Sequence, residues 1–387
     1  MAPNVLFLSP HFPPGWHRFC KQLKVHGARV IGVGDVAPGA LSDQVRASLD
    51  EYVYRPDLND VDALEALGRH LIQRWGPIHR IDSLNEHWLG VEAELRVRLG
   101  VPGMTPDFLK VGRDKVGMTR RYREAGIPCA QGHEVGSLGD LQAFAHEVGF
   151  PLILKPAVGV GAQGATRIDT SDELLQVYAK IDTPYLAESF VVGDVVSFDG
   201  LTDGSGEIVF HTAHINCAGV LECSQGEVQT WYHSYRDIPP ALEAMGRKVV
   251  AAFDLRERFF HAEFFLKPDG TFQAIEINLR PPGGFTVDLM NDGSDVDLYD
   301  WWARVILGLD VPAHPSRLYF SAHVARRDGL QYANAPSTVK AWLGPALRRH
   351  QRVPTVFAQA MGDEVYLIRE RNLQSLKGDI AFIQQLT

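Results

Sequence analysis

The 387-residue sequence predicts a protein of mixed α/β and α+β class, with a parallel sheet first, a small α+β unit next and a larger antiparallel sheet last. Three observations support this prediction. The chain is about twice as long as a usual domain, so more than one compact unit is expected. Apolar strands alternate with helical patterns over the first hundred residues, which is typical of a parallel sheet. From Asp194 onward strands dominate, interrupted by a helical segment over residues 240–253.

Composition excludes several classes of protein. The chain is 45% hydrophobic and 22% charged, which is ordinary for a globular protein and excludes a disordered one. A net charge of −9 argues against a broad nucleic-acid surface, so no nucleic-acid partner is expected. Apolar stretches fall short of the roughly 20 residues of a membrane span, and the N-terminal run lacks the basic segment of a signal peptide. We therefore expect a soluble, cytoplasmic protein without a membrane partner.

The alternating elements of the N-terminal domain, residues 1–110, are predicted as strands over residues 5–8, 29–33, 51–54 and 80–84 and helices over 16–25, 61–75 and 89–99. Ligands of parallel sheets bind beyond the carboxyl ends of the strands, which places Asn85 and Glu86 at the binding edge. Gly32-Val-Gly34 does not fit a dinucleotide fingerprint, because the third glycine is missing and no helix opens directly after it.

The middle of the chain, residues 111–190, is predicted as a small α+β unit. Its elements are helices over 114–125 and 172–180 and strands over 150–155, 165–168 and 185–192, with a glycine-rich loop after Lys155. Residues 191–387 form the last domain, which short strands over 353–359 and 364–368 complete.

The strongest chemical signal is the segment Glu276-Ile-Asn278-Leu-Arg280. Alternate side chains of a strand share a face, so the carboxylate, the amide and the guanidinium project together. This combination suits a hard cation and a phosphate. The alternative is a solvated polar face.

The preceding strand supports a cation site. Pairing Leu266 with Thr271 across the turn at residues 267–270 places Glu263 opposite Ala274, diagonal to Glu276. Two acidic side chains on neighbouring strands normally repel each other. Their presence here is explained if a divalent cation binds between them and neutralises their charge.

Two further segments are consistent with a nucleotide. Lys155 ends a strand and is followed by Gly159, Gly161 and Gly164, whose backbone N–H groups could wrap phosphate oxygens. The Gly-Lys-Ser/Thr ending of a Walker loop is missing, so a P-loop NTPase is excluded. Glu188 and the extended backbone after it could read an adenine edge, with Asp194 placed for ribose hydroxyls.

The order of these segments resembles the ATP-grasp superfamily: Asp114-Lys115, Lys155 with its glycine loop, Glu188 to Asp194, then Glu263, Glu276, Asn278 and Arg280. The resemblance covers residues 110–310. It implies the ATP-grasp fold, with a Rossmann-like domain (1–110), a lid subdomain (111–190) and a C-terminal domain that carries the Mg²⁺ site (191–387).

The resemblance also implies roles for individual residues. ATP would be held by Lys115 and Lys155 at the phosphates, Gly159, Gly161 and Gly164 in the lid loop, Glu188 and Phe190 at the adenine, and Asp194 at the ribose, where the family more often has glutamate. Mg²⁺, or Mn²⁺ in its place, would be bound by Glu263, Glu276 and Asn278. Arg280 would be catalytic, because it would stabilise the transferring phosphoryl group.

The segment Arg280-Pro-Pro-Gly283-Gly284 is similar to that of the L-amino acid ligases and related carboxylate–amine ligases. The similarity implies an ADP-forming ligase that makes an amide or peptide bond through an acylphosphate, with an amino-acid-like carboxylic acid and an amine as partners. Glu86, His233, Gly283 and Gly284 are the candidate substrate residues, and a homodimer is compatible with the sequence. An ATP-binding regulatory protein and an ATP-grasp kinase remain the alternatives.

Overall fold

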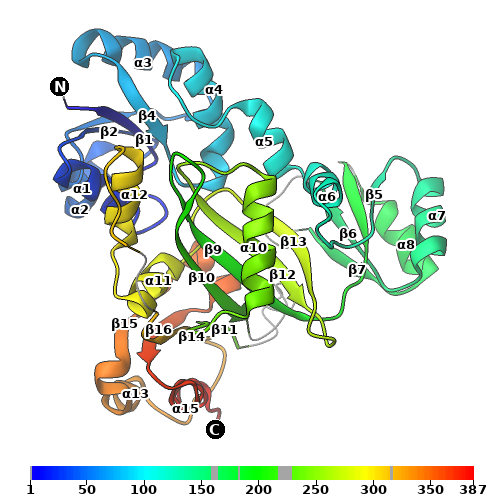
Figure 1. The fold of residues 1–387 in the computed structure, drawn as a ribbon. Coiled ribbons are helices and arrows are strands. Elements are labelled where there is room, and N and C mark those ends of the chain that lie inside the picture. Colours follow the sequence, from blue (N-terminus) through cyan, green and yellow to red (C-terminus); the bar gives the residue numbers. More distant parts are fainter. Residues whose placement is uncertain (1, 158–163, 182–183, 217–228, 314–316) are drawn as a thin grey trace.

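The chain folds around three sheets that follow one another in sequence (Figure 1). The structure is a computed structural model and describes residues 2–157, 164–181, 184–216, 229–313 and 317–387. The sheets are a four-stranded parallel sheet, a four-stranded antiparallel sheet and an eight-stranded antiparallel sheet, which confirms the predicted mixed class. Among the described residues, no helix is both long and apolar enough to span a bilayer.

The N-terminal sheet has the strand order β3-β2-β1-β4. Its elements are β1 (Asn4–Leu8), α1 (His17–Val25), β2 (Arg29–Gly34), α2 (Asp43–Ala47), β3 (Glu51–Tyr54), α3 (Val61–Trp75), β4 (Ile78–Asp82) and α4 (Leu89–Leu99). Strand β1 is buried along its whole length, as expected for a central parallel strand covered on both faces. Val5 and Phe7 pack toward α1, whereas Leu6 and Leu8 pack toward α3 and α4.

The small sheet has the order β5-β8-β6-β7 and projects from the rest of the molecule in Figure 1. The elements of this region are α5 (Pro106–Arg113), α6 (Lys115–Glu124), β5 (Gly132–Val135), α7 (Leu138–Val148), β6 (Leu152–Pro156), β7 (Thr166–Ile168), α8 (Ser171–Tyr178) and β8 (Tyr185–Ser189). Helices α7 and α8 bury one core with this sheet. Helix α6 instead packs through Met118 and Tyr122 against the core of the large sheet.

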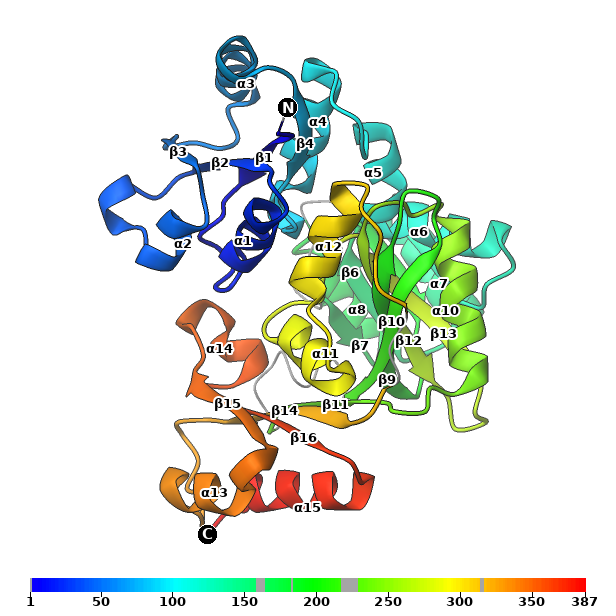
Figure 2. The same cartoon turned by 60° about the vertical axis from the view of Figure 1, so that its left-hand side comes forward.

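The large sheet has the order β13-β12-β9-β10-β11-β14-β16-β15. Its strands are β9 (Asp194–Thr202), β10 (Ile208–Asn216), β11 (Trp231–Ser234), β12 (Phe259–Leu266), β13 (Phe272–Asn278), β14 (Phe320–Arg326), β15 (Leu347–Arg352) and β16 (Glu364–Glu370). The helices of this part are α10 (Pro240–Ala252), α11 (Thr286–Ser294), α12 (Leu298–Ile306), α13 (Pro336–Leu343), α14 (Thr355–Met361) and α15 (Leu373–Gln384). Helix α10 lies across one face of the sheet, and α12 packs on α1 of the N-terminal domain (Figures 1 and 2).

The predicted strand over residues 353–359 is wrong, because this segment forms α14. The preceding strand, β15, ends at Arg352, and Pro354 immediately precedes the helix. Phe357, Ala360 and Met361 are spaced three and four residues apart, so a helix brings them to one face. Figure 2 shows α14 beside the N-terminal domain, although more than two hundred residues separate the two in the sequence.

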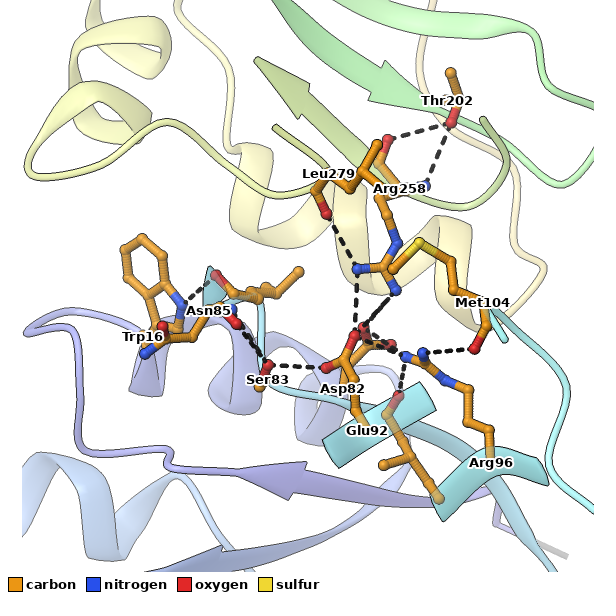
Figure 3. A network of polar contacts seen from close by, with 12 residues as sticks. Trp16, Asp82, Ser83, Asn85, Glu92, Arg96, Met104, Thr202, Arg258 and Leu279 are labelled. Atoms are coloured by element: carbon orange, nitrogen blue, oxygen red, sulfur yellow. Dashed lines mark hydrogen bonds and ion pairs between the residues drawn. The ribbon is translucent and has the colours of Figure 1, made fainter. Parts of the chain in front are cut away.

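A buried cluster of four charged side chains joins the N-terminal domain to the large sheet (Figure 3). Asp82 ends β4, Glu92 and Arg96 lie on α4, and Arg258 immediately precedes β12. The Arg258 guanidinium is 3.3 Å from Asp82 and 3.4 Å from Glu92, and Arg96 is 3.3 Å and 3.2 Å from the same two carboxylates. Burial raises the pKa of Asp82, against the effect of the two arginines.

The same cluster reaches the end of β13. Arg258 donates a hydrogen bond of 3.2 Å to the carbonyl oxygen of Leu279, and Ser83 donates one of 2.8 Å to Glu92. Leu279 precedes Arg280, and Ser83 precedes the loop that carries Glu86. The cluster therefore sets the relative position of two candidate site segments that are distant in sequence.

Replacing Arg258 by methionine should leave Asp82 and Glu92 buried with one fewer counter-charge. Loss of one partner of a buried ion pair lowers the free energy of unfolding by about 3–5 kcal/mol, and we expect a loss in that range, measured by chemical denaturation. Arg256→Met is the matched control, because Arg256 is exposed and pairs with the exposed Asp254. Equal denaturation midpoints for the two variants would contradict the structural role of the cluster.

Candidate active site

The hairpin of β12 and β13 brings two carboxylates face to face. Glu263 pairs directly with Glu276, and His261 pairs with Asn278. Glu276 is 8% exposed, its carboxylate accepts a 3.0 Å hydrogen bond from the Asn278 side-chain amide, and Lys115 Nζ lies 3.9 Å away. Burial and the neighbouring Glu263 raise the pKa of Glu276, whereas Lys115 and Asn278 oppose the shift.

The predicted register of this hairpin is wrong, and the observed one places the acidic residues closer together. Leu266 pairs with Phe272 rather than Thr271, and a bulge follows between Glu263 and Phe264. The bulge lies where the Ala274 N–H donates to the carbonyl oxygen of Pro128, at 2.7 Å, outside the hairpin. The turn and the bulge each shift the register by one residue, so Glu263 pairs with Glu276 rather than with Ala274. Because the two shifts add up to two residues, the side chains stay on the predicted face of the sheet.

These residues fit a hard divalent cation. Carboxylate and amide oxygens are the ligands that Mg²⁺ prefers, and facing carboxylates gain from a cation between them. In the part of the chain that the structure describes, no three His, Cys, Asp or Glu side chains are grouped to hold a metal. Two carboxylates and one amide would therefore leave coordination positions for other oxygens, such as those of phosphates or water.

Two of the ten lysines of the chain lie beside this site, and both are buried. Lys155 is the penultimate residue of β6, and its Nζ is 2.6 Å from Glu188 on the adjacent strand β8. Lys115 begins α6, and its backbone N–H donates to the carbonyl oxygen of Ala157, which ties the helix to the end of β6. The structure thus brings together Lys115, Lys155, Glu188 and the acidic hairpin.

The predicted phosphate loop is described only in part. Gly159 and Gly161 lie outside the described residues. Gly164 has φ +75°, and a Cβ there would lie 2.9 Å from Pro156, so this position favours glycine. Phe190 follows β8 with the Arg167 guanidinium over its ring, 4.6 Å from the centroid, and Asp194 is exposed at the start of β9.

A cavity of about 420 Å³ opens beside the hairpin, between the N-terminal domain, the large sheet and α14. Its wall contains Phe12, Trp16, Asn85 and Glu86 from the N-terminal domain, Ser197, His214, Asn216, Tyr232, His261 and Glu263 from the sheet, Arg280 to Gly284 from the loop after β13, and Phe357, Ala360 and Met361 from α14. Four of the predicted residues therefore meet here with Glu263: Glu86, Arg280, Gly283 and Gly284.

Glu86 and Arg280 form an ion pair in the wall of this cavity. Glu86 is held in a short 3₁₀ turn after β4, and its carboxylate is 3.0 Å from Arg113 and 3.4 Å from Arg280. Arg280 also donates to the carbonyl oxygen of Pro281 at 2.9 Å. An anion and a cation side by side could hold a substrate that carries both charges.

The cavity is closed on its apolar side by α14. Phe357 stacks on Phe12 of the N-terminal domain, with ring centroids 5.4 Å apart. Gly284 has φ +63°, and a Cβ there would lie 1.8 Å from the terminal carbon of Met361. Glycine at this position thus allows α14 to approach the loop that follows Arg280, whereas Gly283 has no neighbour that would exclude a side chain.

His233 does not line the cavity. Strand alternation turns Tyr232 toward the cavity and His233 toward the opposite face, where its ring stacks on Trp231 with a centroid separation of 5.8 Å. Burial lowers the pKa of His233. Tyr232 is instead fixed by a 2.8 Å hydrogen bond to Thr286.

Sequence reasoning did not find a group of polar residues on the floor of the cavity. Ser197 and Asp199 on β9 and His214 on β10 share this face with His261. Asp199 is fully buried and lies 2.7 Å from His214 Nδ1, with His261 Nδ1 on its other oxygen. Alternating polar residues within otherwise buried strands were the only signal in the sequence.

Comparison with known proteins gives the context of this geometry. Residues 114–193 match the family model "Carbamoyl-phosphate synthase L chain, ATP binding domain". A solved L-amino acid ligase from Bacillus licheniformis superposes with a TM-score of 0.75 at 16% identity, covering 98% of this chain and 96% of that one. The chain has the ATP-grasp fold. The predicted resemblance to the ATP-grasp superfamily is confirmed.

The curated relatives match only part of this chain. The carbamoyl phosphate synthase large chain of Thermoanaerobacter pseudethanolicus is 23% identical over 232 residues, which are 56% of this chain and 20% of the relative. The L-arginine-specific L-amino acid ligase of Bacillus subtilis is 23% identical over 255 residues, 63% of this chain and 61% of the relative. The chain thus spans from one fifth to about three fifths of these relatives.

Replacing Glu276 by glutamine should abolish the Mg²⁺-dependent stabilisation of the ATP-grasp domain by ATP, because the neutral amide loses one of the two facing charges. We expect the melting temperature of the wild-type protein to rise with ATP and Mg²⁺ together, and that of Glu276→Gln to stay unchanged. Glu207→Gln is the control, since Glu207 is exposed in the turn between β9 and β10. If the melting temperature of Glu276→Gln rose with ATP and Mg²⁺ as much as that of the wild-type protein, Glu276 would not be a metal ligand.

Proposed function

We propose that the protein is an ADP-forming carboxylate–amine ligase that joins amino-acid-like substrates through an amide bond. The observation that carries the proposal is the position of Arg280, which follows the acidic hairpin by two residues and also lines the cavity, 3.4 Å from Glu86. One residue could therefore contact both a phosphoryl group held near the hairpin and a carboxylate bound in the cavity.

Separate groups of residues would bind ATP and Mg²⁺ in this reaction. Lys115, Lys155 and the loop around Gly159, Gly161 and Gly164 would hold the ATP phosphates, Glu188 and Phe190 the adenine, and Asp194 the ribose. Glu263, Glu276 and Asn278 would hold Mg²⁺, which neutralises phosphate charge when bound. The family model and the fold support ATP as the nucleotide.

Arg280 would serve the bond-making steps. A substrate carboxylate attacks the γ-phosphorus of ATP, which releases ADP and leaves an acylphosphate. An amine then attacks the acyl carbon, the amide bond forms and inorganic phosphate leaves. The guanidinium stays charged at any working pH and presents a fork of donors that matches both carboxylate and phosphate oxygens. Its expected contribution is the stabilisation of the oxygens on which negative charge develops.

The cavity supports an amino-acid-like substrate. Glu86 and Arg280, 3.4 Å apart, place opposite charges side by side, which suits a substrate that carries both an ammonium and a carboxylate group. The wall formed by Phe12, Phe357 and Met361 is apolar and would take the side chain of that substrate.

Hydroxylamine trapping tests this function. The protein is incubated with ATP, Mg²⁺, hydroxylamine and a panel of carboxylic acids, and we expect a hydroxamate to form with ADP for the acids that are activated. Lys155→Ala should abolish both products with the fold intact, whereas Lys180→Ala on the exposed surface should retain them. ADP release with a hydroxyl compound instead would indicate a kinase, and ATP binding without turnover would indicate a regulatory protein.

The apolar wall predicts the size preference for the carboxylic acid. Phe357→Ala should raise the KM for large apolar acids at least tenfold with a smaller effect on small acids, because the aromatic contact across the cavity is lost. Val356→Ala on the same helix is the control, since Val356 is 67% exposed. An unchanged preference in Phe357→Ala would show that α14 does not contact the substrate.

A further inference from the structure

The imidazole of His214 lies on the floor of the cavity and has no role in the function proposed above. His214 is 3% exposed, and among the described residues its Nε2 has no hydrogen-bond partner. A buried polar atom without a partner costs free energy, so it points to a group that binds there. His214 also lines the cavity that contains Glu263 and Arg280.

The surroundings of His214 determine which ring nitrogen carries the proton. Asp199 is fully buried, and its carboxylate lies 2.7 Å from Nδ1. Ser197 Oγ and the Nδ1 atoms of His214 and His261 all meet this carboxylate, and hydrogen bonds from such donors favour the ionised form of Asp199. An ionised carboxylate only accepts hydrogen bonds, so Nδ1 is the donor, and a neutral ring at this position has its lone pair on Nε2.

Neighbouring groups hold this arrangement rigid. Ser197, opposite His214 on β9, donates a 2.5 Å hydrogen bond to Asp199, and His261 contacts the other carboxylate oxygen. The Tyr232 ring meets the His214 ring edge-on at 6.1 Å. The imidazole is therefore oriented by three strands of the large sheet before any substrate binds.

Resting on the proposed function, we propose that His214 is the general base that accepts a proton from the attacking amine, with Asp199 as its positioning residue. Amino groups of amino acids are mostly protonated at neutral pH, and an ammonium has no lone pair for attack. Nε2 takes one proton from the ammonium, and the nitrogen attacks the acyl carbon as the C–O bond to phosphate breaks. The second proton leaves with the phosphate, and Asp199 stabilises the imidazolium.

The chemistry of the pocket agrees with an amine rather than an anion at this position. A lone pair on Nε2 accepts from N–H donors. Glu263 and Glu86 also line the cavity, where they are paired with His261 at 3.0 Å and with Arg280 at 3.4 Å. Arg280 lies at the same cavity, where it can hold the acyl oxygens that the amine must reach.

His214→Asn tests the proposal through two reactions of the same protein. Hydroxylamine is uncharged at neutral pH and needs no base, so hydroxamate formation should stay within about threefold of wild type. Amide formation from an amino-acid amine should fall by about 10²–10⁴-fold, the usual contribution of a general base. His211→Asn is the matched control, because His211 is also buried on β10 but lies beside Glu243 on α10.

The pH profile adds a readout that a structural role would not give. The rate of amide formation by His214→Asn should rise with pH, because the fraction of unprotonated amine rises. The ratio of the wild-type rate to the variant rate should therefore be smaller at high pH. The titratable and charged groups around His214 are Asp199, Tyr232, His233, His261, Glu263, Glu86 and Arg280. These groups remain in the variant, so their titrations are common to both profiles.

Each outcome decides between the alternatives. An equal loss of hydroxamate and amide in both His214→Asn and His214→Gln would overturn the proposal in favour of a structural role. Amide formation at the wild-type rate would overturn it as well. Failure of the wild-type protein to form any hydroxamate would instead refute the ligase function itself. That result is obtained with the wild-type protein alone, before any variant is measured.

Discussion

The buried charges of Asp82, Glu92, Arg96 and Arg258 are the constraint on which the candidate site depends. Charges with almost no access to water are costly unless they are paired, so the two domains can separate only by exposing or unpairing them. Arg258 also binds the backbone of Leu279. The segment that ends in Arg280 is thereby held against the N-terminal loop that carries Glu86, and the cavity forms between them.

A second constraint acts within the hairpin of β12 and β13. Two carboxylates paired across strands destabilise a sheet unless a cation or donors offset their repulsion. Here Lys115 and Asn278 offset part of it, whereas burial and the neighbouring Glu263 raise the pKa of Glu276. Facing carboxylates in a partly offset arrangement of this kind are typical of a site arranged for a ligand.

The sequence predicted the site where local patterns determine geometry and failed where distant contacts do. The face shared by Glu276 and Asn278 followed from strand alternation, and Lys155 was placed correctly at a strand end. The register failed because the turn pairs Leu266 with Phe272, and a bulge beside the hydrogen bond from Ala274 to Pro128 adds a second one-residue shift. Helix α14 was missed because a short apolar segment fits either a strand or a helix until its packing partners are known.

The amino-acid sequence by itself determined the mixed class, the order of the sheets and the acidic hairpin, since alternation, turns and helical spacing are local properties of the chain. The tertiary structure alone decided the cavity. It pairs Glu86 with Arg280, closes the wall with Phe357 and aligns His214 with Asp199. These residues lie on different elements, so only the folded packing of both domains, held by the buried ion cluster, brings them together.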